Sequence, residues 1–218
     1  MTTAVREKPI LMSRDMVHAI IDGRKTMARI PLKPQPPEYW SPIGCGRYSP
    51  TVIGHDGEGQ PGPEIFGVYD EEWGIACPFG SVGDLLRVRE KWRCHLGDID
   101  DPLTMNYAAD DSVREINPDS VLWEPYESLL DWKWKPSIHM PRWATRLWLT
   151  ITNVHVERLQ SISESDAAAE GVDAIPSAPA AMTHRTAFAG LWDKFAKPGS
   201  QWKDNPWCWC ISFQVVTT

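Results

Sequence analysis

The segment from Met16 to Arg29 constrains the fold of this chain more than any other, because it fixes where a helix ends and where a basic stretch begins. Apolar residues recur four positions apart in it and give a helix one apolar face: Met16 with Ile20, and Val17 with Ile21. Ser13 is placed to cap the start of this helix, and Gly23 can adopt the left-handed conformation that ends it. The segment therefore predicts a short amphipathic helix that stops abruptly.

Basic residues come directly after this helix end. Arg24 and Lys25 lie just past the helix C-terminus, where the helix dipole favours cations, and Arg29 comes four residues later. A lysine next to a glycine turn is held in position, which predicts a binding or catalytic role. The sequence leaves a plainer alternative open, in which these three cations only keep an exposed strand edge in water.

Composition places the chain in a broad class. No apolar run in the 218 residues approaches the ~20 needed to span a bilayer, and the stretch 1–8 lacks the apolar core of a signal peptide. The length suits one domain with insertions or two small domains, either of which can bury a core. An odd number of cysteines, five, without an export signal predicts reduced thiols in a cytoplasm.

Charge is unevenly distributed along the chain. The net charge is −7, which argues against a protein that coats nucleic-acid phosphates in general. However, residues 1–37 and 133–146 each carry a net charge of +4, which leaves −15 for the rest. Two basic stretches on an acidic body predict a local anionic ligand rather than a long duplex.

Periodicity predicts several short strands and a few helices in a single α+β domain, 1–218. Strands are expected over 8–12, 85–90, 147–156 and 207–215, and helices over 13–22, 163–170 and 188–195. In the strand 147–156, one face is expected to carry Leu147, Leu149 and Ile151, and the other Trp148, Val154 and Val156. The stretches 36–80 and 97–135 are expected to be loop-rich insertions.

Familiar catalytic and metal-binding motifs are missing from the sequence. Cys208 and Cys210 lie on one side of a predicted strand, but no second pair at zinc-site spacing accompanies them, and the six histidines are dispersed. Core thiols are therefore expected, with no metal and no cofactor. Most of the twelve tryptophans are expected in the core, but Trp92 and Trp143 adjoin basic residues and are predicted to stack on a ligand.

Several segments, in the right order, resemble one known family. Ala19–Thr26 resembles the hydrophobic–Gly–basic–Lys–Thr signature of ASCH domains, which are small β-barrels related to the PUA RNA-binding fold. Val82–Val88 is similar to the family's Gly-Asp turn and central strand, and Leu159–Gly171 to the helix that comes next. Further segments resemble the longer, Trp-rich branch seen in phage and prophage proteins: Tyr107–Asp110, Met140–Ala144 and Asn205–Val216. The resemblance implies a PUA-like, ASCH-type small β-barrel with flanking helices and long loop insertions.

The resemblance also implies roles for particular residues. Some ASCH proteins are amidohydrolases that remove the acetyl group from 4-acetylcytidine with a Lys, a Thr and a Glu. The Lys corresponds to Lys25 and the Glu to Glu170, but the Thr falls on Ala28, whose methyl group cannot transfer a proton or attack a carbonyl. Thr26 has a hydroxyl next to Lys25, but in an extended segment it points to the opposite face, so it is a weak substitute.

These observations favour a protein that binds a nucleoside, a nucleotide or a short single-stranded RNA in a cleft. Arg24, Lys25, Arg29, Trp92 and Trp143 are the predicted binding residues, with Glu170 beside Lys25. Two alternatives remain open. One is an amidohydrolase acting on acetylated cytidine or a related modified nucleoside, in which Lys25 is the base and Glu170 its partner. The other is a phage interaction or structural protein. No membrane partner is expected, the compartment is a cytoplasm (the host's, for a phage protein), and no oligomeric state is indicated.

Overall fold

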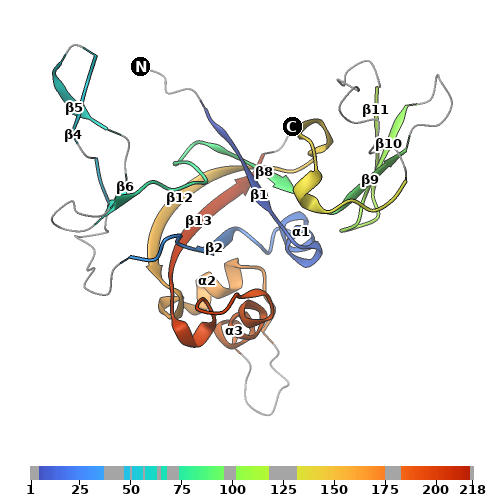
Figure 1. Ribbon diagram of the computed structural model, residues 1–218. Helices are drawn as coiled ribbons and strands as arrows, with labels where there is room; N and C mark the ends of the chain where they lie inside the picture. Colours follow the sequence, from blue (N-terminus) through green and yellow to red (C-terminus); the bar gives the residue numbers. More distant parts are fainter. Residues whose placement is uncertain are drawn as a thin grey trace.

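The computed structural model describes residues 5–36, 47–49, 51–55, 57–62, 65–67, 74–95, 102–117, 132–174 and 183–216. Within them the protein is mixed α+β: strands in several sheets make up most of the regular structure, and three α-helices accompany them (Figure 1). The α+β class predicted from periodicity is confirmed.

The largest sheet has five strands in the order β1 (Glu7–Leu11), β8 (Leu85–Arg89), β12 (Trp148–Arg158), β13 (Trp207–Val215) and β2 (Met27–Pro31). β1 and β8 run parallel, and the other neighbours are antiparallel. The long strands β12 and β13 arch through the middle of the molecule (Figure 1). The pairings among the described residues leave β1 and β2 as the two edges, so they give an open order and not a closed barrel.

A bulge in β12 changes which residues face the core. The pairing with β13 shifts between Ile151 and Asn153. Because an extra residue reverses the alternation of side chains, Val154 joins Leu149 and Ile151 in the main hydrophobic cluster. The expectation that Val154 and Val156 share the face of Trp148 is therefore wrong: Val156 also packs against that cluster.

The Gly-Asp turn before β8 is held by a buried carboxylate. Asp84 accepts hydrogen bonds from the backbone N–H groups of Ser81 (2.9 Å) and Arg6 (3.0 Å). Burial alone would raise the pKa of Asp84, but these backbone donors and the Arg6 guanidinium lower it. A Cβ at Gly80 would come within 2.6 Å of the Asp84 carboxylate, so this turn needs a glycine there.

All three α-helices begin with the side-chain caps expected of Ser and Thr. α1 (Arg14–Ile21) is capped by Ser13, α2 (Glu164–Ala169) by Ser163 and α3 (His184–Phe195) by Thr183. α1 ends at Gly23, whose φ of 73° is the predicted left-handed conformation. α2 and α3 lie together at one end of the arch of β12 and β13 (Figure 1), over a small cluster that contains Leu159, Ile162, Ala167, Phe188 and Cys208.

A second sheet occupies part of the stretch 97–135 that was predicted to be loop-rich. β9 (Trp92–His95), β10 (Leu103–Tyr107) and β11 (Val113–Ile116) form an antiparallel sheet in the order β11-β10-β9. β10 buries alternate residues, which is the pattern of a half-buried strand. The sheet has its own hydrophobic cluster around Trp92 and Tyr107.

Short strands occupy the described part of the other insertion, 36–80. β3 (Arg47–Tyr48), β6 (Ile65–Gly67) and β7 (Gly74–Ile75) form one small sheet, and β4 (Thr51–Ile53) pairs with β5 (Gly59–Pro61). Parts of both insertions lie outside the described residues. Among the described helices, none has the length and apolar character needed to cross a membrane.

Candidate functional site

Lys25 is placed by the end of α1 and by a close approach of the segment that comes after α2. The backbone N–H groups of Arg24 and Lys25 both donate to the Ala19 carbonyl at 2.8 Å, which folds the chain back after Gly23. Lys25 then forms an isolated antiparallel bridge with Glu170. Gly171 makes this approach possible, because a Cβ there would lie 2.8 Å from Ala19 and 2.9 Å from Lys25.

The side chains of Lys25 and Glu170 form a buried ion pair. The Lys25 Nζ lies 2.7 Å from Glu170 Oε2 and also donates to the Glu170 carbonyl at 3.0 Å. The two side chains are only 1% and 5% exposed. Residues 145 positions apart in sequence are thus brought into contact, as the family resemblance implied.

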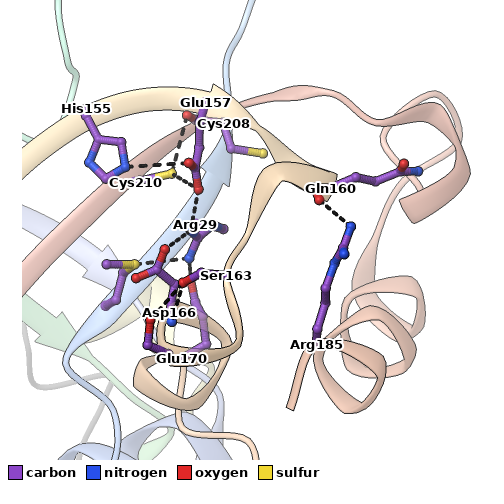
Figure 2. A network of polar contacts seen from close by, with 12 residues as sticks. Arg29, His155, Glu157, Gln160, Ser163, Asp166, Glu170, Arg185, Cys208 and Cys210 are labelled. Carbon is purple, nitrogen blue, oxygen red and sulfur yellow. Dashed lines mark hydrogen bonds and ion pairs between the residues drawn. The ribbon is translucent and has the colours of Figure 1, made fainter. Parts of the chain in front are cut away.

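Arg29 connects this pair to two further carboxylates (Figure 2). Its Nη1 lies 3.4 Å from Glu170 Oε1, and its Nη2 contacts Glu157 Oε1 and lies 3.3 Å from Asp166 Oδ2. Burial opposes the charge of Arg29, but Cys210, Glu157 and Glu170 beside it raise its pKa above the ordinary value. Arg29 therefore stays charged, although its side chain is 0% exposed.

Three carboxylates and two cations make up this cluster, which we call the Lys25 cluster: Lys25, Arg29, Glu157, Asp166 and Glu170. Sequence reasoning missed Glu157 and Asp166 as members. The sequence around Asp166 indicates only the start of a helix. Glu157 lies just past the predicted strand 147–156. The Arg29 Nε has no hydrogen-bond partner among the described residues, so part of the donor capacity of the cluster is unused.

The Lys25 cluster opens onto a cleft of about 570 Å³ beside the edge strand β2. Lys25, Arg29 and Glu170 contribute its polar lining. Lys33 and Lys197, both exposed, add two more basic groups. The remaining walls are mainly apolar and include Met16, Phe79, Phe188, Leu191, Trp192, Phe195 and Trp209. A cleft of this size with apolar walls and a few convergent polar groups suits a small organic ligand.

None of the five aromatic side chains that line the cleft was predicted to bind a ligand, and one of them, Trp209, belongs to β13. Phe188, Trp192 and Phe195 come from one face of α3, and Phe79 from the loop before β8. The helical spacing of the α3 residues is visible in the sequence, but it also fits a helix that packs on a core. Phe195 is 63% exposed, whereas a residue that packs on a core is buried. Its exposure therefore favours a cleft lining over core packing.

Arg24 and Thr26 lie outside this cleft lining. The Arg24 guanidinium is on the surface, where it donates to the Gly171 carbonyl (3.0 Å) and to Asp22 (3.1 Å). The Thr26 side chain is exposed, and its backbone N–H donates to the Ala169 carbonyl. Both residues hold the segments around Lys25 together, and neither side chain is presented to the cleft.

Trp92 and Trp143 are also placed away from the cleft. Trp92 is 0% exposed in the cluster of the second sheet, and Trp143 packs against it with ring centroids 6.0 Å apart. A fully buried ring has no free face for a base. The prediction that Trp92 stacks on a ligand is therefore corrected, because the hydrophobic cluster of the second sheet covers its ring.

Ala28 lies on the core side of β2. It is buried in the main hydrophobic cluster and pairs with Ile211 of β13. Since successive side chains of a strand point to opposite faces, Arg29 faces the carboxylates and Ala28 faces the core. The missing hydroxyl of the amidohydrolase pattern thus corresponds here to a position that does not line the cleft.

The Lys25 cluster has the groups for proton transfer. A lysine and a glutamate in contact can pass a proton between them or to a ligand, and Arg29 supplies a fixed positive charge. No protein-family model, curated protein or solved structure matches this chain. The function therefore has to be argued from the geometry of the site.

Proposed function

We propose that this protein binds a nucleoside, a nucleotide or the end of a short single-stranded RNA in the cleft beside β2. The observation that carries the proposal is the buried Lys25–Glu170 pair, which opens onto a cleft walled by aromatic rings. Aromatic side chains stack on bases, and cations bind phosphate or the polar edge of a base. The proposal includes the ASCH-type, PUA-like fold and a cytoplasmic location.

The distribution of charge in the cleft supports this ligand class. Lys33 and Lys197 are exposed lining residues, whereas Lys25 and Arg29 are buried and already paired with carboxylates. Exposed lysines suit a phosphate that keeps part of its water, and the buried groups suit the polar edge of a base. The apolar walls between them suit the flat faces of that base.

The binding test compares the two kinds of lining residue. Nucleosides, nucleotides and short RNAs are titrated by calorimetry against the wild type, Phe195→Ala and the double variant Lys33→Met/Lys197→Met. Phe195→Ala is expected to weaken all ligands, and the double variant only the phosphorylated ones, with affinity falling as salt rises. Lys203→Met, an exposed lysine outside the cleft lining, is the matched control. Wild-type affinity in both cleft variants would contradict the proposal.

An amidohydrolase is the second candidate function. The contact of 2.7 Å between Lys25 Nζ and Glu170 Oε2 favours it, because a buried lysine–carboxylate pair can take a proton from water and return it to a leaving amine. The described lining residues offer one hydroxyl, that of Ser200, as a nucleophile. Hydrolysis by this protein would therefore use activated water or Ser200.

Mass spectrometry of 4-acetylcytidine and related amides after incubation with the protein tests this candidate. Glu170→Gln keeps the shape of the side chain and removes its charge. If the protein is a hydrolase, this variant loses turnover by a factor of about 10²–10⁴ and still binds the nucleoside. Binding without product in the wild type favours the binding protein, and neither binding nor product favours the remaining alternative, a phage interaction protein.

A further inference from the structure

A second set of polar side chains adjoins the Lys25 cluster and shares Glu157 with it. His155 and Glu157 are two residues apart on β12, so both side chains are on the same face of the sheet. Cys210 of β13 is the direct cross-strand partner of His155. Figure 2 shows the imidazole, the carboxylate and the thiol converging there, and one donor atom from each lies within 4.8 Å of the others.

The spacing of these three groups approaches that of zinc ligands. His155 Nε2 lies 3.9 Å from Glu157 Oε2, the oxygen offered to the metal, and Cys210 Sγ lies 3.6 Å from the other oxygen, Oε1, which also contacts Arg29. Tetrahedral zinc with Zn–N and Zn–O bonds of about 2.0 Å and Zn–S bonds of about 2.3 Å sets its ligand atoms roughly 3.3–3.6 Å apart. Small side-chain rotations would therefore bring the three donors to one ion.

The charge around this set favours a dication. Glu157, Asp166 and Glu170 carry three negative charges against the two positive charges of Lys25 and Arg29. One zinc ion bound with one cysteine thiolate adds a single positive charge and brings the whole group to neutrality. A buried set of charges is stable when the charges compensate one another.

The exposure of the three side chains and the orientation of the imidazole also fit a metal site. The side chains of His155 and Glu157 are 31% and 23% exposed, whereas Cys210 is buried, so an ion can reach the thiol past the other two groups. The Asn153 amide lies 3.3 Å from His155 Nδ1, and with its oxygen turned to the ring it would accept the Nδ1 proton and leave Nε2 free for the metal. Cys208 differs from Cys210, because its Sγ contacts the Pro206 carbonyl at 3.6 Å.

We propose that His155, Glu157 and Cys210 bind one zinc ion, with water as the fourth ligand. Binding displaces the proton of the Cys210 thiol into solvent. Glu157 keeps one oxygen on Arg29 and offers the other to the metal, so the zinc site and the cleft share Arg29 as a neighbour. Neither the nucleoside ligand nor hydrolysis is needed for this inference.

Cobalt titration of the tag-free, metal-stripped protein tests the site. Co²⁺ bound by Cys210 gives a thiolate-to-metal charge-transfer absorption that saturates at one equivalent and is removed by one equivalent of Zn²⁺. Cys210→Ser is expected to abolish this absorption, and His155→Gln to weaken binding about 100-fold or more. Asn153→Ala is expected to weaken it about 10-fold.

Cys208→Ser is the matched control, since it removes the neighbouring buried thiol and should leave the cobalt spectrum unchanged. His155→Gln changes a partly exposed side chain, so it keeps the test decisive if Cys210→Ser does not fold. A wild-type spectrum without the charge-transfer absorption, an unchanged cobalt affinity in His155→Gln, or loss of the absorption in Cys208→Ser would overturn the proposal. Unchanged cobalt binding in Phe195→Ala separates it from the proposed function.

Discussion

Two clusters of buried charge among the described residues differ in how completely their hydrogen-bond donors are satisfied. The Lys25 cluster joins β2, β12 and α2, and it faces the cleft. The other cluster lies between the central sheet and the second sheet, and we call it the Arg146 cluster: Glu90, Tyr107, Asp110, Ser112 and Arg146. Each contains an arginine that contacts more than one acidic group.

In the Arg146 cluster each of the three guanidinium nitrogens has a hydrogen-bond acceptor. Its Nε and Nη2 lie 2.8 and 2.9 Å from the two oxygens of Glu90, and its Nη1 lies 2.8 Å from Asp110. The guanidinium also lies 4.2 Å from the centroid of the Tyr107 ring. Burial opposes the charge of Arg146, but the hydrogen bonds to these carboxylates raise its pKa.

In the Lys25 cluster the arginine contacts three carboxylates through single atoms, and its Nε is unpartnered among the described residues. Two-point pairing of the kind seen at Glu90 fixes the geometry of the guanidinium, and the Asp110 and Ser112 oxygens accept from its remaining nitrogen. Single-atom contacts leave donor capacity for a ligand. Burial of charge alone therefore does not distinguish the two clusters, whereas incomplete pairing next to a cleft makes the Lys25 cluster the candidate site.

The largest expected effect is on the free energy of unfolding, and it differs between substitutions of the two arginines. Arg146→Met leaves Glu90, with a side chain only 2% exposed, without its partner, and should lower the free energy of unfolding by about 3–5 kcal/mol. Arg29→Met should cost only about 1–3 kcal/mol, because Lys25 still pairs with Glu170 and the other two carboxylates reach water. Urea unfolding measures both. Ligand binding should be lost in Arg29→Met and kept in Arg146→Met. The reverse result would contradict the assignment of the ligand site to the Lys25 cluster.

A second prediction concerns the hydroxyl that the amidohydrolase pattern lacks. Ala28→Thr places a hydroxyl in the main core, so it should destabilise the protein by about 1–3 kcal/mol and produce no gain in 4-acetylcytidine hydrolysis. Ala28→Val has the same shape without the hydroxyl and is the control. Product formed by Ala28→Thr and not by Ala28→Val would show that this position does reach the site.

The Arg146 cluster should also govern stability in acid. Burial would raise the pKa of Asp110, but Arg146 and Ser112 outweigh it and lower that pKa from 3.8 to about 2. A carboxyl with a lower pKa in the folded state stabilises the protein above its unfolded pKa, and this contribution is lost as pH falls from about 4 to about 2. The loss should be at most about 2 kcal/mol. Unfolding curves at about pH 6 and about pH 2 should show it in the wild type and a smaller loss in Asp110→Asn. Equal losses in both proteins would contradict this assignment.

The smallest expected effect belongs to Arg24, which the sequence predicted to bind the ligand. Its partly exposed ion pairs with Asp22 and Asp173 contribute little, so Arg24→Ala should change the free energy of unfolding by less than about 1 kcal/mol. Affinity for nucleotides should stay within about twofold of the wild type, as calorimetry can establish. A tenfold loss of affinity would place Arg24 in the site and extend the Lys25 cluster outward.

Features that depend on near neighbours in the chain could be predicted from the sequence. Ser13 and Gly23 define the ends of α1, Ser163 the start of α2, and the alternation of β13 its strand, because caps and periodicity are properties of a few consecutive residues. The contact between Lys25 and Glu170 was anticipated only through the family resemblance, since no local pattern joins residues so far apart.

Which side chains meet depends on how distant segments pack, and the sequence does not show it. The bulge at Ile151/Asn153 changes the alternation along β12, and the register with β13 sets Cys210 opposite His155. The packing of the second sheet buries Trp92, while α3 brings Phe195 to the cleft. Trp92 and Phe195 are both aromatic residues with basic neighbours in the sequence, so composition cannot tell them apart. Their roles differ because burial is decided by contacts between segments that are distant in the chain.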